Sequence, residues 1–168
     1  SGVRLVEGRA RLLDAHTDEV AGRTYTAAHI LVATGGWPTL PKIRGIEHCL
    51  TSNEALELPD LPRRVLVVGG GYVAAEFTGI FHGVGSQVIL AYRGEQILRG
   101  FDLDVRQHLH QELLRKGIDI RLGCDVAGIE RRPDGALEAR LVAAGAAATV
   151  VVDAVMYATG RHANTAGL

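Results

Sequence analysis

The chain has 168 residues, of which 47% are hydrophobic and 22% charged, a composition typical of one folded core with appended segments. Its formal net charge of −1 provides no basic surface that would favour nucleic acid as a partner. No apolar run approaches the ~20 residues of a membrane-spanning helix, and no leader precedes the first apolar segment. With only two, widely separated cysteines, Cys49 and Cys124, the sequence predicts a cytoplasmic protein with reduced thiols and no membrane partner.

The first segment, residues 1–47, predicts short strands. Residues 3–13 alternate loosely between apolar and polar side chains and indicate a strand pair broken at Gly8. Residues 17–19 suit a turn, and residues 20–26 suit another short strand.

A fully apolar strand is expected at Ile30–Ala33, where it runs into Thr34-Gly35-Gly36. The prolines and glycines that follow, up to residue 47, exclude a long regular element and indicate a linker that leaves the end of the strand. Residues 48–62 predict a further linker with one short helix, which Pro59 and Pro62 end.

The centre of the chain alternates strand and helix patterns, an order that predicts a parallel sheet with right-handed crossovers. The strand patterns cover residues 65–68, 88–91 and 118–122, and the helices begin near Tyr72 and at Asp102 or Asp104. Three short alternating runs follow, and Pro133-Asp134-Gly135 between the first two is a hairpin-turn signal. We therefore expect an antiparallel meander before a last strand at residues 154–158.

Two segments share one form, because Ile30–Gly35 and Val155–Gly160 are both apolar strand patterns that end in Ala-Thr-Gly. If the chain passes between two domains at each of them, the residues between form one complete domain. We predict this central domain at residues 63–157. Residues 1–47 would belong to a neighbouring domain, residues 48–62 would be the linker, and residues 158–168 would begin the return. By this interpretation the chain is a fragment of a larger protein.

The strand at 65–68 ends in Gly69-Gly70-Gly71, directly before a helix, which is the arrangement that binds a diphosphate. In this G-x-G-x-x-A pattern Gly69 allows the sharp turn, Gly71 lets the backbone approach the diphosphate, and Ala74 lets helix and strand pack closely. Free N–H groups of the first helical turn, together with the helix dipole, would bind the anion. A surface turn would also use glycines, but the strands on both sides favour a dinucleotide site.

The end of the next strand distinguishes NAD from NADP. An NAD site usually places a carboxylate there, about 20 residues after the glycines. This chain instead has Arg93 and Arg99, and its first acid, Glu95, comes too late to be the strand-end carboxylate. Because guanidinium groups match phosphate geometry, the pattern predicts NADPH, with two solvated surface arginines as the alternative.

Other residues near the glycines have more than one interpretation. Tyr72 in the first helical turn is either a packing aromatic or a lid over the nicotinamide, and Glu76 one turn later is by default a solvated glutamate. Three histidines, at positions 82, 108 and 110, show no metal-ligand spacing with an acid or a cysteine, so no metal site is predicted.

These motifs resemble the central part of the glutathione-reductase family of flavin disulfide reductases, and nearly the whole chain takes part. Ile30–Gly36 looks like the first exit from the FAD domain, Gly69–Phe81 like the NADPH fingerprint helix, and Ala158–Arg161 like the return to the FAD domain. The most specific match is Tyr92–Asp102, which is similar to glutathione and trypanothione reductases and unlike the NAD-using lipoamide dehydrogenases. The short connection Gly83–Gln87 favours a glutathione reductase over a trypanothione reductase.

The resemblance implies an α/β, Rossmann-like FAD/NAD(P)-binding fold with a central parallel sheet, an antiparallel β-meander crossover and flanking strands from the FAD domain. It implies that Arg93 and Arg99 bind the 2′-phosphate and that Tyr72 swings aside when nicotinamide stacks on flavin. Glu76 would pair with a lysine outside this chain, and Arg161 would lie near the cofactor. The expected cofactor-binding residues are Gly69, Gly70, Gly71, Tyr72, Val73, Ala74, Glu76, Arg93, Arg99, Gly160 and Arg161.

The resemblance also implies a homodimeric parent enzyme that passes electrons from NADPH through FAD and a redox disulfide to glutathione disulfide. The sequence contains no FAD fingerprint, no C-x₄-C disulfide and no C-terminal histidine–glutamate pair. We therefore expect no catalytic residue in this chain, which would bind NADP(H) without turnover. Two alternatives are another flavin disulfide reductase, of trypanothione, mercuric or lipoamide type, and a stand-alone, non-catalytic NADPH-binding module. In a fragment, Ile30–Ala33 would lose its parent sheet, so we expect it to be exposed, disordered or self-associating.

Overall fold

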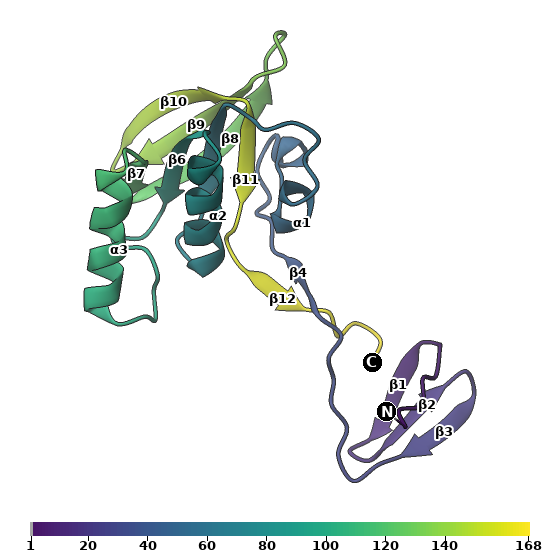
Figure 1. The fold of residues 1–168 in the computed structure, drawn as a ribbon. Helices are drawn as coiled ribbons and strands as arrows, with labels where there is room; N and C mark the ends of the chain where they lie inside the picture. Colours follow the sequence, from purple (N-terminus) through teal and green to yellow (C-terminus); the bar gives the residue numbers. More distant parts are fainter. Residues whose placement is uncertain (1) are drawn as a thin grey trace. The chain divides into compact units, whose positions relative to one another are not determined.

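The computed structural model describes residues 2–168, which divide into two compact units (Figure 1). One unit contains the residues up to Trp37 together with His162–Leu168, and the other contains Pro38–Arg161. Two short strands, β4 (Gly36–Pro38) and β12 (Arg161–Ala163), pair with each other in a two-stranded sheet.

The smaller unit contains an antiparallel meander of β1 (Ala10–Asp14), β2 (Thr17–Val20) and β3 (Arg23–Thr26). Residues 3–9 form no strand, so the predicted strand pair at 3–13 is wrong in its first half. The turn expected at 17–19 is also wrong. Turns lie instead on both sides of it, at residues 15–16 and at 21–22, so that residues 17–20 pair with strands on both sides. Ala21 and Gly22 both have positive φ angles (50° and 76°), as a tight hairpin requires.

Ile30–Ala33 forms no strand, which corrects the prediction for this segment. Among the described residues no neighbouring strand offers it a hydrogen-bonding edge, and apolar composition alone does not hold an extended segment in a sheet. The side chain of Leu31 is 88% exposed. The expected exposure of this segment is therefore confirmed.

The larger unit is built on a four-stranded parallel sheet in the order β11-β5-β6-β7. The strands are β5 (Arg64–Val68), β6 (Gln87–Tyr92), β7 (Asp119–Leu122) and β11 (Ala154–Tyr157). β5 is buried along its apolar run because both faces of the sheet are covered. The predicted parallel α/β core is confirmed.

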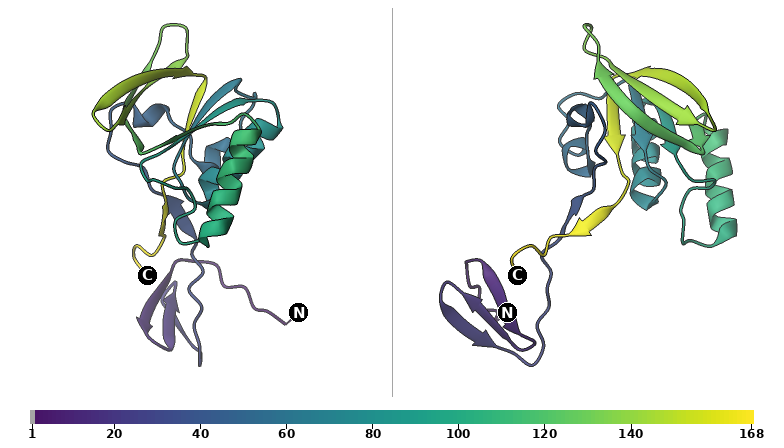
Figure 2. Two further views of the ribbon diagram at one scale, coloured as in Figure 1. Left: turned by 90° about the vertical axis from the view of Figure 1, so that its left-hand side faces the viewer. Right: turned by 180° about the vertical axis from the view of Figure 1, so that it is seen from behind.

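Alternate residues of β5 belong to two different cores. Val65 and Val67 pack with α2 (Tyr72–Gly83) and α3 (Leu103–Arg115), whereas Leu66 and Val68 pack with the antiparallel sheet. That sheet consists of β8 (Cys124–Arg131), β9 (Leu137–Ala143) and β10 (Ala146–Val152), which confirms the predicted meander. Figures 1 and 2 show the resulting three layers, with the two helices on one side of the parallel sheet and the meander on the other.

The linker before β5 contains the 3₁₀ helix η1 (Ile46–His48) and the short helix α1 (Ser52–Ala55), which was expected. Thr51 and Glu54 close the N-terminus of α1 with a capping box. Between the two helices, the Leu50 N–H donates to the Val155 carbonyl and the Leu50 carbonyl accepts from the Tyr157 N–H, both at 2.8 Å. The linker therefore covers the outer edge of β11.

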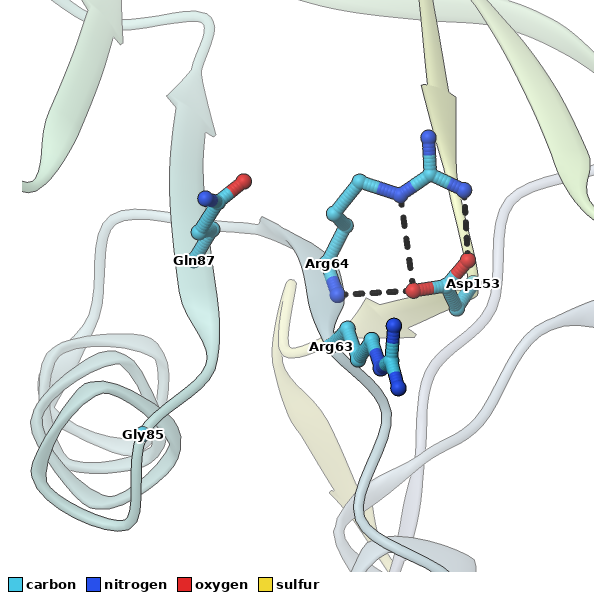
Figure 3. Close-up of a pocket in the computed structure, with 5 residues that line it drawn as sticks. All are labelled: Arg63, Arg64, Gly85, Gln87 and Asp153. Carbon is cyan, nitrogen blue, oxygen red and sulfur yellow. Dashed lines mark hydrogen bonds and ion pairs between the residues drawn. The ribbon is translucent and has the colours of Figure 1, made fainter.

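An ion pair fixes the start of β11 to the start of β5 (Figure 3). The Asp153 carboxylate accepts hydrogen bonds from the Arg64 backbone N–H at 2.9 Å and from Arg64 Nη2 at 2.6 Å. The Asp153 N–H in turn donates to the Arg64 carbonyl at 2.9 Å. Hydrogen bonds from Arg64 hold the pKa of the Asp153 carboxyl below its usual value.

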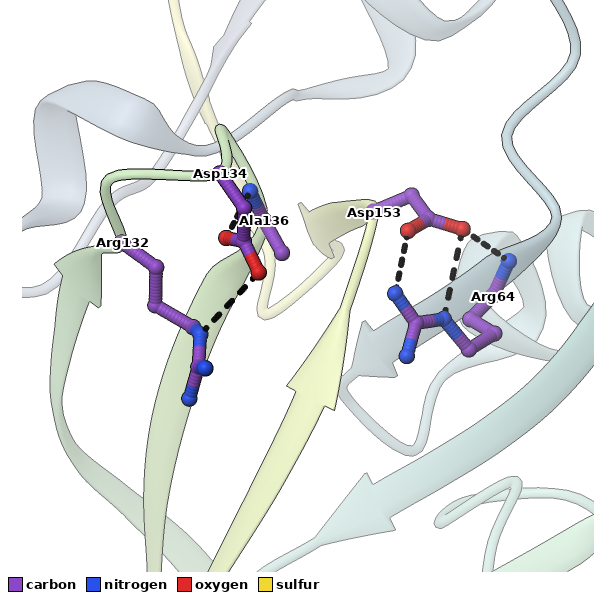
Figure 4. Close-up of polar contacts among 5 residues, drawn as sticks. All are labelled: Arg64, Arg132, Asp134, Ala136 and Asp153. Atoms are coloured by element: carbon purple, nitrogen blue, oxygen red, sulfur yellow. Dashed lines mark hydrogen bonds and ion pairs between the residues drawn. The ribbon is translucent and has the colours of Figure 1, made fainter.

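A second polar cluster closes the hairpin between β8 and β9, as the Pro133-Asp134-Gly135 signal predicts (Figure 4). Asp134 Oδ1 accepts from the Ala136 N–H at 3.2 Å, and Asp134 Oδ2 lies 3.5 Å from Arg132 Nε. Both charged side chains are largely exposed, so this cluster orders a surface turn and contributes little to stability.

Candidate functional site

The carboxyl ends of β5, β6 and β11 open into a cleft of about 1150 Å³. In open parallel sheets this is the edge at which ligands bind. The predicted residues that line the cleft are Gly69, Gly70, Gly71, Tyr72, Val73, Arg93, Arg99, Gly160 and Arg161. Ala74 instead lies buried behind it, and Glu76 is exposed one helical turn further along α2.

Gly69 is required by the backbone itself. Its φ angle is +141°, and a Cβ there would lie 2.3 Å from the carbonyl oxygen of Ala158. The same Cβ would lie 3.3 Å from the Ala74 methyl, so the small residue at position 74 does permit close packing of helix and turn. The end of β11 and the glycine turn thus touch at a point where no side chain fits.

The next two glycines have different requirements. A Cβ on Gly70 would lie 2.4 Å from the ring of Tyr92, so this glycine makes room for an aromatic side chain of the protein. A Cβ on Gly71 would meet no protein atom within 4 Å. The protein alone therefore does not require glycine at position 71, whereas a ligand close to the backbone would.

The N-terminus of α2 is prepared for an anion. Gly71 is the N-cap residue, no side chain caps the helix, and its first turn contains no acidic residue. The N–H groups of a first helical turn have no partner within the helix, and the helix dipole adds partial positive charge there. Because Gly71, Tyr72 and Val73 line the cleft, this charge faces the cavity.

Two exposed arginines follow β6 in the same cleft. Arg93 comes directly after the strand and Arg99 lies in the following loop. Within residues 2–168 no ion pair includes either guanidinium. The carboxylate of Glu95 also lies in the loop, three residues beyond the strand end, and no acid precedes it. Arg93 and Arg99 thus carry positive charge into the cleft without an ion-pair partner in residues 2–168, although the carboxylates of Glu95 and Asp125 also line it.

The loop that contains these arginines is anchored at several points. Ile97 and Leu98 are buried, and Leu98 holds a positive φ angle of 56°. The Leu98 N–H donates to the Gly70 carbonyl at 2.6 Å, which ties the loop directly to the glycine turn. The Gly94 carbonyl accepts from the Gly123 N–H at 3.0 Å.

Arg106 in the first turns of α3 also contacts this loop, a contact that the sequence alone does not reveal. Its Nε donates to the Ile97 carbonyl at 2.8 Å and its Nη2 to the Gln96 carbonyl at 3.1 Å. Nothing in the local pattern indicated this role, because an arginine in an exposed helical turn is ordinarily solvated. Only the return of the loop onto the helix brings the guanidinium to its carbonyls.

The whole chain, residues 1–168, matches the pyridine nucleotide-disulphide oxidoreductase family. The chain belongs to this family. It is 45% identical over its full length to a glutathione reductase of Burkholderia cepacia, of which it covers 36%. Over 142 residues it is 49% identical to a trypanothione reductase of Trypanosoma congolense, a match that covers 83% of the chain and 28% of that relative.

A solved structure gives the same assignment. The HOCl-induced flavoprotein disulfide reductase RclA of Escherichia coli superimposes with a TM-score of 0.76 at 28% identity. The match covers 97% of this chain and 37% of RclA. The chain spans about a third of the length of the curated relatives it matches. The Rossmann-like fold predicted from the sequence is thus confirmed, and the chain is part of a flavoprotein disulfide-reductase family.

The segment that follows β11 borders one side of the cleft, where residues 158–161 line it. The Gly160 carbonyl accepts from the Thr39 N–H at 2.9 Å, and the Thr159 hydroxyl donates to the Thr39 carbonyl at 3.0 Å. Arg161 Nη1 donates to the Ser52 hydroxyl at 3.1 Å. Thr39 and Ser52 therefore hold residues 158–161 at the cleft.

No cluster of three or more metal-ligating side chains occurs in residues 2–168, and no helix in that range is long and apolar enough to cross a membrane. Both cysteines are free. Burial, with a smaller contribution from Glu47, raises the pKa of the Cys49 thiol to about 12, and burial likewise raises that of Cys124, so both are protonated at neutral pH.

A second hollow, of about 530 Å³, lies at the opposite edge of the sheet (Figure 3). Its lining includes Arg63, Gln87 and the Arg64–Asp153 pair. These residues stand at the amino ends of their strands, where parallel sheets do not bind cofactors. Since Arg64 is already paired with Asp153, this hollow is not a candidate site.

Proposed function

We propose that the cleft binds NADPH and that this chain forms the NADP(H)-binding part of a flavin disulfide reductase acting on glutathione disulfide. One observation carries the proposal: two unpaired arginines and an uncapped helix N-terminus face a single cleft. NADPH has two anionic groups, a diphosphate and a 2′-phosphate, and the cleft offers a separate cationic or N–H-rich region for each.

The residues would divide the cofactor between them. Gly71 and the first turn of α2 would hold the diphosphate, and Arg93 and Arg99 would hold the 2′-phosphate. Tyr72, which is 57% exposed at the cleft, would cover the nicotinamide, the part of the cofactor that supplies a hydride when bound. Gly160 and Arg161 would border the cofactor on the far side, and Glu76 would face a partner group outside this chain.

Two observations support glutathione disulfide as the substrate of the parent enzyme. The glutathione reductase of Burkholderia cepacia matches the whole chain at 45% identity. The connection between α2 and β6 spans only residues 84–86, and a short connection here favours a glutathione reductase over a trypanothione reductase. The Ser86 hydroxyl in this connection donates to the Pro62 carbonyl at 2.6 Å. The similarity to a trypanothione reductase makes trypanothione disulfide the second candidate. Homodimerisation and a cytoplasmic location stay predictions from the family resemblance.

Titration of the chain with NADPH and with NADH tests the cofactor. Charge-assisted hydrogen bonds contribute about 1.5–3 kcal/mol each, so two partly exposed ones should favour NADPH by roughly two orders of magnitude. Replacing Arg93 and Arg99 together by alanine should weaken NADPH strongly and NADH little. Arg115→Ala on α3, which removes an exposed arginine paired with Glu112, is the matched control. Equal affinity for both nucleotides in the unaltered chain would refute the cofactor assignment.

The substrate is tested on the product of the complete reading frame. NADPH consumption should be fast with glutathione disulfide and slow with trypanothione disulfide or Hg(II). The reverse preference would assign a different reductase of the same family. A frame that encodes neither an FAD fingerprint nor a redox disulfide would instead favour the stand-alone binding module.

A further inference from the structure

We propose that Arg106 is a positioning residue that sets the preference of the cleft for NADPH over NADH. The inference rests on the proposed function, because it concerns the loop that would bind the 2′-phosphate. Arg106 lies on α3 and also borders the cleft, but its guanidinium is bonded to loop carbonyls, through which we infer that it acts.

The geometry is that of a fork on two adjacent carbonyls. Nε of Arg106 reaches the Ile97 oxygen and Nη2 reaches the Gln96 oxygen, so one rigid guanidinium holds two consecutive peptide units. Within residues 2–168 no ion pair includes Arg106. The side chain is half-buried, and its guanidinium donates to these two backbone oxygens.

The held peptides control where Arg99 points. Leu98 follows directly and is in a left-handed conformation that a leucine rarely adopts unless its surroundings impose it. Its N–H is bonded to Gly70 of the diphosphate-binding turn, and its side chain is buried. Arg106 on one side and Gly70 on the other therefore fix the loop immediately before Arg99.

The distance between two anion sites depends on this loop. In NADPH the diphosphate and the 2′-phosphate are attached to the same ribose, which keeps their separation within a narrow range, so Arg99 must be held at a set position relative to the N-terminus of α2. If the Gln96 and Ile97 carbonyls are released, the loop loses its contact with α3, and Arg99 becomes a mobile surface cation. NADH has no 2′-phosphate and would be insensitive to that change.

The test compares Arg106→Met and Arg106→Lys with Arg115→Met, a control on the same helix. Both Arg106 variants should bind NADPH about tenfold more weakly, the equivalent of one lost charge-assisted hydrogen bond, and NADH within about twofold of the unaltered chain. Lysine keeps the charge but is a point donor that cannot bridge two carbonyls in the same way, so it should not restore affinity. Hydrogen exchange at the Leu98 amide should be faster in both variants and unchanged in Arg115→Met.

Each other outcome overturns the proposal in an identifiable way. If Arg106→Lys bound NADPH as tightly as the unaltered chain, Arg106 would act through its charge on the cofactor and not through its bonds to the two loop carbonyls. Equal losses for NADPH and NADH would mean a general structural defect. An unchanged NADPH/NADH ratio in Arg106→Met, in a chain that does prefer NADPH, would reject the role of Arg106 alone. No preference in the unaltered chain would reject the proposed function as well.

Discussion

Ile30–Gly35 and Val155–Gly160 both begin as apolar runs and end in Ala-Thr-Gly, but only the apolar run of the second forms a strand. Ala154–Tyr157 is buried as β11 and pairs in parallel with β5. Residues 30–35 form no strand, and Leu31 is almost fully exposed. The composition of the two is nearly the same, so their difference comes from their neighbours.

β11 is held on both of its edges. On one edge β11 forms a ladder of hydrogen bonds with β5, and on the other edge it forms two hydrogen bonds with the Leu50 backbone. Asp153 fixes the register at the start, and the close contact between Ala158 and Gly69 fixes it at the end. An apolar run thus becomes a strand when backbone partners and a covered face are present together.

The largest expected effect comes from truncating one side chain in each segment. Met156 is completely buried, so Met156→Ala should lower the free energy of unfolding by about 2–5 kcal/mol through lost packing and a cavity. Leu31→Ala removes an exposed side chain and should change it by less than about 0.5 kcal/mol. Urea denaturation followed by circular dichroism measures both. Similar losses in the two variants would show that residues 30–33 are packed in solution.

A smaller and pH-dependent effect is expected from Asp153→Asn. Arg64 lowers the pKa of Asp153 in the folded chain, so the pair stabilises the fold above the unfolded pKa, and this contribution is lost as pH falls through the lower folded pKa. The variant should be less stable than the unaltered chain at pH 7, with the difference shrinking below about pH 4. Asp134→Asn, at the exposed hairpin turn, is the control and should have a weaker effect. A difference that grows in acid would contradict the assigned pair.

The smallest effect on stability is expected from Leu31→Lys, which tests what the exposed segment does. The substitution should leave the unfolding free energy within about 0.5 kcal/mol, since the site is exposed. It should reduce self-association, because a charge on an apolar extended segment opposes pairing between copies. Sedimentation velocity over a range of concentrations measures this. If the unaltered chain is monomeric throughout, the segment does not self-associate.

The local signals predicted most of the larger unit. An apolar run, a glycine turn and a helical repeat specify β5 and α2 because all three act over a few residues. Asp102 was one of two expected caps of α3, and it does accept a hydrogen bond from the Asp104 N–H. The hairpin at residues 133–135 follows equally from its turn residues.

The errors and omissions concern contacts between distant residues. The strand at Ile30–Ala33 was predicted from composition, but pairing requires a partner that composition does not supply. Gly70 stays a predicted cofactor-binding residue, but the sequence did not reveal that the ring of Tyr92 excludes a side chain there. Arg106 was missed because its carbonyl partners lie on a loop that folds back onto its helix.

The hydrogen bonds of Leu50 have a consequence for exchanging parts between reductases. Because Leu50 covers the outer edge of β11, a chimera that takes the larger unit only from residue 63 onward would leave that edge uncovered. An uncovered edge strand pairs readily with other chains, so such a hybrid should aggregate even though every strand and helix of the parallel sheet is present. A junction placed before Ile46 keeps η1, Leu50 and α1 with the sheet they cover, and hybrids joined there should not aggregate.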